Sequence, residues 1–268
     1  MARPTPLYGR DVNQRRALGL WMALAAAAGA TNVIAFIACS RFVTHVTGIA
    51  TTIGLDAADF EHAIDYSLVL LSFIAGACAS EFVLGGGPIR RGMCRVLLCV
   101  AAILASIALA GHLDAFDAFS EGVEDPRTFV FLGALAFAMG LQNGAISSAT
   151  GGRVRTTHMT GPATDLGVAL ARLMSASRKE RVSAYQLARL RVIKLTGFIT
   201  GAGLGAVAAR YEYLGLLLPA AICALVGLVL RRTPTPMGAK VNESMDAARA
   251  SSKSNSHSHG APLQHPTR

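Results

Sequence analysis

Residues 17–39 read ALGLWMALAAAAGATNVIAFIAC, an apolar stretch without a charged side chain. A helix needs about 20 predominantly apolar residues to cross the hydrocarbon core of a bilayer. A helix that is apolar on all sides is buried in a large core or spans a membrane. The basic residues before the stretch are also typical of a signal peptide, but the stretch runs past signal length and lacks a clear small-x-small cleavage site. We therefore predict a transmembrane helix.

Five more apolar blocks follow, so the sequence predicts six transmembrane helices. They lie at about residues 66–84, 96–111, 129–149, 192–209 and 214–230. The composition agrees, because 52% of the 268 residues are hydrophobic and only 15% are charged, against about 25% charged in soluble domains. The sequence thus predicts an all-α membrane protein and argues against a soluble enzyme.

The chain divides by composition into three parts. Residues 1–16 form a short basic N-terminus, and residues 17–231 hold the six-helix membrane domain. Residues 232–268 are rich in Pro, Ser, Asn and His and have little apolar content. Such a segment cannot bury enough apolar surface to fold, so we expect a disordered cytoplasmic tail.

Charge alternates from one loop to the next along the chain. Lysine and arginine gather before the first block, at 90–95, at 153–194 and after the last block, whereas the loops at 56–65 and 114–125 are acidic. Because cytoplasmic loops carry an excess of Lys and Arg, both ends of the chain are predicted to be cytoplasmic. The net charge of +9 is spread over every second loop, so a nucleic-acid-binding patch is not predicted.

Two polar segments resemble each other. Residues 44–55 read THVTGIATTIGL and residues 157–168 read THMTGPATDLGV, with seven of twelve positions identical. Most of the identical residues are polar or glycine, so shared hydrophobicity does not explain the match. The two halves, about 17–111 and 128–230, each contain three spans. Because three is odd, the second copy would enter the membrane from the opposite side, which predicts a 3+3 inverted repeat of the kind found in many secondary transporters.

The second copy and its flank resemble the YoaK-type family of bacterial membrane proteins of unknown function. The residues that carry the resemblance are GLQN at 140–143 and TTHMTG at 156–161. The first copy, FVTHVTG at 42–48, is similar to that family's Phe-x-x-x-Met-Thr-Gly-Asn element, with Val46 and Ile49 as departures, and Asn32 stands where an Asp is common. The resemblance implies six helices in a bacterial inner membrane and no established activity.

The two polar segments form the candidate substrate site, as discontinuous or re-entrant elements. If both insert into the bundle, the N–H groups and positive dipole ends of their helices would favour an anion or carboxylate. The histidines could bind substrate or carry a proton near neutral pH. The candidate substrate-binding residues are Asn32, Thr44, His45, Thr47, Gly48, Gln142, Asn143, Thr157, His158, Thr160, Gly161 and Asp165.

The local chemistry of the second copy predicts the start of a helix. Thr160 can cap it, Pro162 suits its first turn, and Asp165 would favour its positive end. An alternative stays open for each polar residue, because such residues in spans also serve as interhelical hydrogen-bonding groups. For Glu81 and Lys194, inside predicted spans, we expect a structural ion pair or contact with the headgroups.

The leading functional hypothesis is a secondary transporter for a small polar or anionic solute, with its site at the midplane between the repeats. The alternative is a membrane scaffold or regulatory subunit that carries no substrate. An intramembrane enzyme ranks last, because Gly-x-Ser-x-Gly, His-Glu-x-x-His and clustered carboxylates are missing from the sequence. No catalytic residue, cofactor or metal site is predicted. The expected partners are the lipid bilayer and the solute, and a homo-oligomer stays open.

Overall fold

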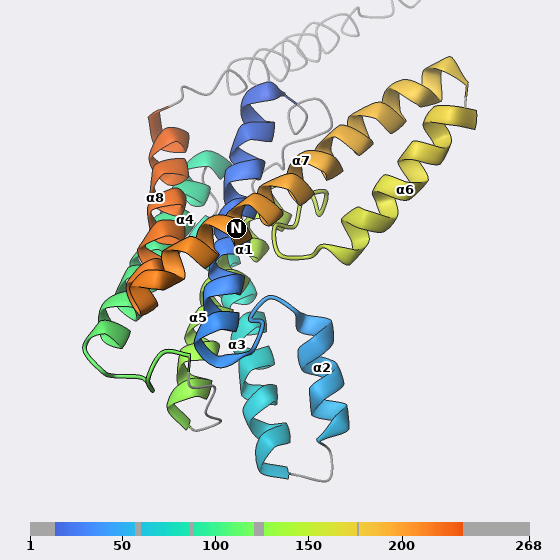
Figure 1. Ribbon diagram of the computed structural model, residues 1–268. Coiled ribbons are helices and arrows are strands. Elements are labelled where there is room, and N and C mark those ends of the chain that lie inside the picture. The colour runs from blue at the N-terminus through green and yellow to red at the C-terminus, as the bar shows by residue number, and fades with distance from the viewer. Residues whose placement is uncertain (1–13, 57–59, 86–87, 121–125, 176, 233–268) are drawn as a thin grey trace, which may run out of the picture. The chain divides into compact units, whose positions relative to one another are not determined.

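The computed structural model describes residues 14–56, 60–85, 88–120, 126–175 and 177–232. Within these ranges the regular secondary structure is entirely helical (Figure 1). The predicted N-terminus and the predicted disordered tail fall almost wholly outside the described residues. The predicted all-helical class is confirmed.

The described residues form eight α-helices and one 3₁₀ helix. In chain order they are α1 (Arg15–Cys39), α2 (Val46–Leu55), α3 (Phe60–Leu84), α4 (Ile89–His112), α5 (Pro126–Ala149), α6 (Thr160–Ser175), α7 (Arg178–Ala208), η1 (Ala209–Leu216) and α8 (Leu217–Arg232).

Five helical segments in the described residues are long and apolar enough to cross a membrane. They are α1, α3, α4, α5 and one continuous segment of 53 residues, Glu180–Arg232. The first four coincide with the first four predicted spans. The fifth and sixth predicted spans both lie in the 53-residue segment, which bends where the backbone of Glu212 leaves helical geometry (φ 52°, ψ −133°).

Large apolar side chains cover the outside of these helices. In α3, only 22% of the most apolar window is buried, and Leu71 and Phe82 are 57% and 79% exposed. An exposed apolar surface of this extent would be unstable in water and is typical of a surface that faces lipid or a partner. Together with the five long apolar segments, it indicates a multi-pass membrane protein.

The most extensive helix packing pairs α1 with α7 and α3 with α5, and glycines make both pairs close. A Cβ added to Gly29 of α1 would collide with the carbonyl oxygen of Phe198 in α7. A Cβ added to Gly140 of α5 would collide in the same way with the carbonyl oxygen of Phe73 in α3. Small residues at membrane helix interfaces let backbones approach closely, so these glycines set the distance between the paired helices.

The two short helices each lie beside the helix that follows them in the chain. The 10-residue α2 packs against α3, and the 16-residue α6 packs against α7 (Figure 1). Each begins directly after a polar loop, residues 40–45 for α2 and residues 150–159 for α6. These two loops and the helix starts that follow them position the candidate site.

Candidate functional site

The two polar segments meet at one pocket of about 470 Å³, which we call the shared pocket. Eight of the twelve candidate residues line it: Asn32, Thr44, His45, Thr47, Asn143, Thr157, His158 and Thr160. Its other lining residues are Phe42, Val46, Phe73, Arg155, Met159 and Phe198. Segments more than 100 residues apart in the sequence are thus brought to the same cavity.

In the first polar segment, α1 holds the loop through Asn32. Its Oδ1 accepts hydrogen bonds of 3.0 Å from both the backbone N–H and the hydroxyl of Thr44. The next residue, His45, is the N-cap of α2. A Cβ added to Gly48 would collide with the imidazole of His45, so the glycine leaves room for the ring above the first turn of α2.

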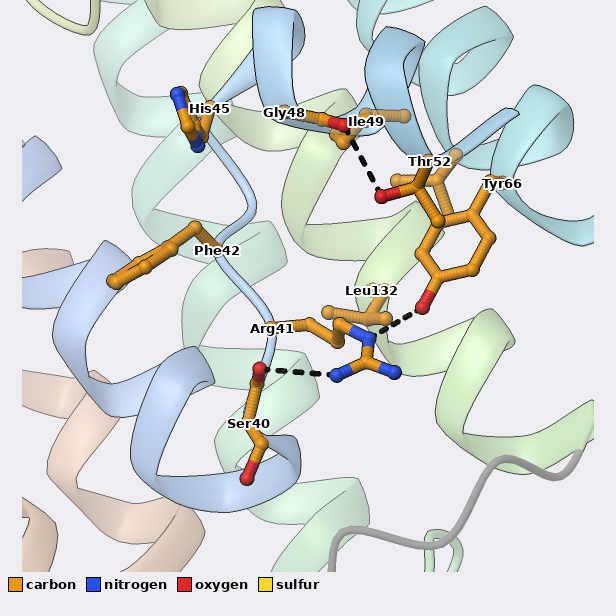
Figure 2. A pocket seen from close by; sticks show the side chains of 10 residues that line it. Ser40, Arg41, Phe42, His45, Gly48, Ile49, Thr52, Tyr66 and Leu132 are labelled. Atoms are coloured by element: carbon orange, nitrogen blue, oxygen red, sulfur yellow. Dashed lines mark hydrogen bonds between the residues drawn. The ribbon is translucent and has the colours of Figure 1, made fainter. Parts of the chain in front are cut away.

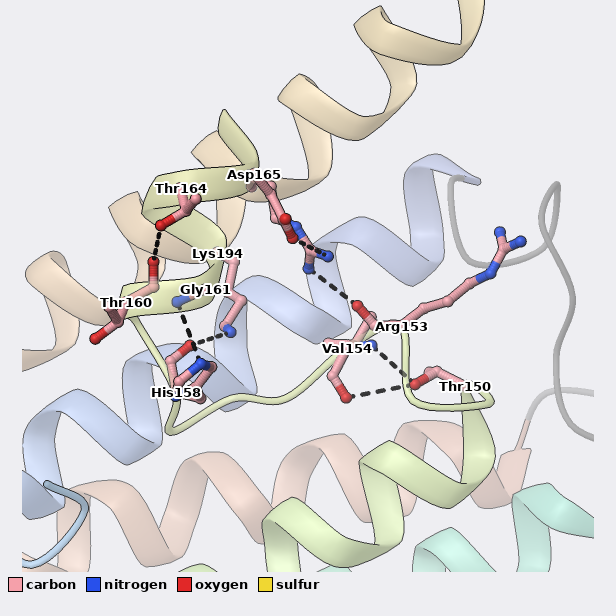
Figure 3. A network of polar contacts seen from close by, with 10 residues as sticks. Thr150, Arg153, Val154, His158, Thr160, Gly161, Thr164, Asp165 and Lys194 are labelled. Carbon is pink, nitrogen blue, oxygen red and sulfur yellow. Dashed lines mark hydrogen bonds and ion pairs between the residues drawn. The ribbon is translucent and has the colours of Figure 1, made fainter. Parts of the chain in front are cut away.

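In the second polar segment, His158 caps α6. Its Nε2 accepts a hydrogen bond of 3.2 Å from the backbone N–H of Gly161 (Figure 3). A Cβ at Gly161 would meet the same ring, as at Gly48 in the first copy. The spacing His-x-x-Gly therefore has a physical reason in both copies: an imidazole lies over the first helical turn, and only glycine leaves space for it.

This capping arrangement differs from the predicted one. Thr160 is the first residue of α6 and Thr47 is the second of α2, so neither stands at the N-cap position. The N-cap residue of α2 makes no side-chain cap hydrogen bond, and at α6 the acceptor belongs to His158. The prediction that Thr160 caps α6 was wrong because the helix begins one residue earlier than the threonine-glycine pair suggests.

Two basic residues of α7 hold the loop before α6. Lys194 is 1% exposed, and its Nζ donates a hydrogen bond of 2.6 Å to the carbonyl oxygen of His158 (Figure 3). Arg191 donates one of 3.0 Å to the carbonyl oxygen of Arg153 and forms an ion pair of 2.8 Å with Asp165. Both ends of the loop are thereby fixed to α7.

The ion pair between Lys194 and Glu81, one of the two arrangements expected from the sequence, does not form. Glu81 instead accepts a hydrogen bond from the hydroxyl of Ser148 in α5. Glu81 thus bonds to a neighbouring helix and Lys194 to the loop before α6, and neither neighbour was visible in the sequence.

The pKa of His158 is lowered from its ordinary value of 6.5. Burial is the largest cause, because it disfavours the charged imidazolium. The positive charges of Lys194 and Arg155 add to the decrease, and Asp165 opposes it. A neutral imidazole with its proton on Nδ1 is also what the hydrogen bond from Gly161 to Nε2 requires.

Four candidate residues lie outside the lining of the shared pocket. Gly48 and Gly161 lie next to the imidazole rings of His45 and His158 and leave space for them. Asp165 is the sixth residue of α6, beyond its first turn, and is paired with Arg191. Gln142 is fully buried and all of its amide is used, as described next.

Gln142 connects three parts of the bundle. Its Nε2 donates to the carbonyl oxygen of Leu24 at 3.0 Å and to the hydroxyl of Thr156 at 3.1 Å. Its Oε1 accepts from the thiol of Cys223 at 3.3 Å. The alternative of an interhelical hydrogen-bonding role therefore describes Gln142.

Asn143 breaks the likeness between the two copies. Its counterpart Asn32 accepts two hydrogen bonds from Thr44, but the Oδ1 of Asn143 is buried and has no hydrogen-bond partner among the described residues. An unpaired buried acceptor costs about 1–3 kcal/mol. Asn143 lines the shared pocket, so a small movement of the pocket wall would make this covered oxygen available to a solute that donates a hydrogen bond.

A second, smaller pocket of about 120 Å³ adjoins the first copy and is called the small pocket (Figure 2). Phe42 and His45 line both pockets. In the small pocket, Arg41 donates a hydrogen bond to the hydroxyl of Tyr66, and its guanidinium carbon lies 5.9 Å from the centre of that ring. Phe42 and His45 thus form a common wall between the two cavities.

Sequence reasoning missed the aromatic residues of the shared pocket and Arg155. Phe73 and Phe198 belong to two similar segments that follow the polar segments, FIAGA at 73–77 and FITGA at 198–202, and Arg155 was counted among the basic residues that set topology. Their equivalent positions in the aligned halves were the signal that could have identified them. Within the described ranges, no group of three His, Cys, Asp or Glu side chains is placed to hold a metal ion.

A family model described as "Protein of unknown function (DUF1275)" matches residues 20–229. This range contains every residue that lines the two pockets. No match was found among curated proteins or solved structures.

Proposed function

The chain belongs to the DUF1275 family, whose function is unknown, and we propose that it is a secondary transporter for a small solute. The shared pocket would be its binding site. The chain would lie in a bacterial inner membrane with both ends in the cytoplasm, as the loop charges and the likeness to YoaK-type proteins predict.

The observation that carries this proposal is the composition of the pocket wall. The fourteen lining residues form seven pairs that occupy equivalent positions in the two halves. The pairs are Asn32 and Asn143, Phe42 and Arg155, Thr44 and Thr157, His45 and His158, Val46 and Met159, Thr47 and Thr160, and Phe73 and Phe198. Transporters built from repeats place their sites at the repeat interface in this way.

The helix packing supports the repeat independently of the pocket. Two glycine contacts are equivalent in the two halves. Gly29 of the first half lies against Phe198 of the second, and Gly140 of the second half lies against Phe73 of the first. In the aligned sequences, Gly29 matches Gly140 and Phe73 matches Phe198.

A second glycine contact repeats the exchange. Gly201 lies against the carbonyl oxygen of Ala26, and Gly76 against that of Phe137. Ala26 and Phe137 are equivalent in the two halves, as are Gly76 and Gly201. A two-fold relation between the halves explains all four contacts, and the 3+3 arrangement would follow if the bend at Glu212 separates a fifth from a sixth span.

A scaffold or regulatory subunit is the alternative function. Such a protein has no need for a polar cavity lined equally by both halves, and an unpaired buried acceptor such as the Oδ1 of Asn143 would then only destabilise it. The pocket therefore favours a transported solute.

Alternating access can be tested without knowing the solute. In a cysteine-free variant, Thr160→Cys would be labelled with a membrane-impermeant thiol reagent in right-side-out and inside-out vesicles. A transporter exposes its pocket to each side in turn, so labelling is expected from both sides. The controls are Leu55→Cys at the end of α2 and Ser175→Cys at the end of α6, which are expected to react from opposite single sides. Labelling of Thr160→Cys from one side only would contradict transport.

A further inference from the structure

We propose that the solute is a small organic monoanion and that Arg155 selects it by charge. This inference rests on the proposed function in one respect, because it assigns the ligand of the same pocket. It differs in that it concerns binding, which can be measured without transport.

The starting observation is the one pair of lining residues that differs in charge between the halves. In six of the seven pairs, a polar residue matches a polar one or an apolar residue matches an apolar one. In the seventh pair, Phe42 of the first half is equivalent to Arg155 of the second half. Among the described residues that line the pocket, Arg155 alone carries a permanent charge. The lining residues of the two halves are thus alike except that the second half adds a cation where the first half has an aromatic ring.

Arg155 is available to a ligand. In the described part of the chain, its guanidinium forms no hydrogen bond or ion pair with another residue, and no carboxylate lines the pocket. Asp165, close enough to His158 to affect its pKa, is already paired with Arg191 at 2.8 Å. A guanidinium presents several N–H donors in a planar fork that fits a carboxylate or sulfonate.

The surroundings of Arg155 favour an anion further. Lys194 lies buried behind the loop on the carbonyl oxygen of His158. The shared pocket also receives the first residues of α2 and α6, whose N-terminal ends carry partial positive charge. Because Arg155 is the one free cation among the lining residues that the structure describes, a second anionic group would meet only neutral partners there, so a monoanion fits better than a dianion.

The size and the apolar residues indicate an organic body. At about 470 Å³ the pocket is within the range of small-molecule sites, larger than an inorganic ion would fill. Phe42, Phe73 and Phe198 line it and would contact an aryl or short alkyl group. The predicted solute therefore has one anionic head and one apolar body.

The test is ligand binding to the purified full chain in detergent, measured by calorimetry. The probes are benzenesulfonate as the monoanion, benzenesulfonamide as a neutral analogue of similar shape, and 1,3-benzenedisulfonate as the dianion. We expect benzenesulfonate to bind at least about tenfold more tightly than the other two, since a charge-assisted hydrogen bond adds about 1.4 kcal/mol or more. Equal affinity for benzenesulfonate and benzenesulfonamide, or no binding of any probe, would overturn the proposal.

Two variants assign the effect to one side chain. Arg155→Gln is expected to lose at least about tenfold in affinity for benzenesulfonate and to leave benzenesulfonamide unchanged. Arg153→Gln is the matched control, because this arginine is an exposed residue of the same loop and does not line the pocket, and its described hydrogen bonds are made by backbone atoms alone. An equal loss in both variants would mean a general effect of loop charge and would contradict a specific role for Arg155.

The labelling and binding experiments fail separately. Monoanion selectivity that depends on Arg155, combined with labelling of Thr160→Cys from one side only, would keep the anion site and remove transport. Labelling from both sides combined with no charge selectivity would keep transport and remove the anion site.

Discussion

The Nε2 atom of His158 accepts a hydrogen bond of 3.2 Å from the backbone N–H of Gly161. This contact joins a pocket-lining histidine to the first turn of α6, so the position of the ring and the start of the helix depend on each other. We expect His158→Ala to lose a helix cap, which costs about 0.5–2 kcal/mol, and His158→Gln to keep most of it, because the amide oxygen can accept the same bond. Thermal unfolding of the purified variants measures the difference, and equal midpoints would argue against the cap.

The surroundings of His158, which favour its neutral form through burial and through the charges of Lys194 and Arg155, should make the stability of the protein depend on pH. The pKa of His158 is lowered below its ordinary value of 6.5 in the folded state, so the unfolded state binds the proton more readily. The stability that the neutral imidazole contributes is present above pH 6.5 and is lost as the pH falls through the lower folded-state pKa. We expect the unfolding temperature to fall from about pH 8 to about pH 5, and to fall less in His158→Gln. A parallel decline in both proteins would assign the pH dependence to other groups.

The close packing of α1 and α7 predicts opposite effects of two alanines in the same helix. Gly201→Ala places a Cβ against the backbone of Ala26, so the helices must separate, at a cost of about 1–3 kcal/mol or more. Gly203→Ala has no atom within 4 Å of the new Cβ and is expected to gain up to about 1 kcal/mol from helix propensity. Unfolding midpoints in detergent give both values, and destabilisation by both alanines would mean that the packing contact is not the cause.

The repeat predicts an equivalent effect in the other half. Gly76→Ala would meet the carbonyl oxygen of Phe137, as Gly201→Ala meets that of Ala26. The two variants should therefore both lose stability, by about 1–3 kcal/mol or more as expected of overpacking. A loss confined to one of the two would show that the halves pack differently.

The pairing of Phe42 with Arg155 predicts the result of exchanging them. The double variant Phe42→Arg, Arg155→Phe moves the guanidinium to the equivalent position of the other half. If the pocket is two-fold related, benzenesulfonate should bind within about tenfold of the original affinity, whereas Arg155→Phe alone should lose binding. Failure of the double variant to recover any affinity would indicate that the two positions are not interchangeable.

Much of the fold could be predicted because hydrocarbon thickness imposes a minimum length on apolar helices. That constraint identified α1, α3, α4 and α5. The same constraint placed the beginning of the fifth helix too far along the chain. α7 begins at Arg178, well before the apolar block at 192–209. A capping box between Ser177 and Glu180 marks this start, and its Ser-x-x-Glu spacing is readable in the sequence. The joining of the last two blocks through η1 could not be predicted, since hydropathy does not record a helix that bends without ending.

The candidate site was predictable where it depended on the repeat. Eight of the twelve candidate residues line the shared pocket because both copies meet there. Gln142 could not be separated from them, since a polar residue within a span looks the same in sequence whether it lines a cavity or connects helices. Arg155 was obscured for a different reason, because its charge had already been explained by membrane topology.

The glycine contacts between α1 and α7 and between α3 and α5 have a consequence for assembly. Among the described helices, α1 packs against α7, η1 and α5, all of which belong to the second half. A polypeptide ending after α4 would therefore carry glycine grooves with nothing to fill them, and we expect it to be stable only beside another copy or beside the missing half. Because α4 and α5 belong to one polypeptide, the two halves that pack together are always made in equal number.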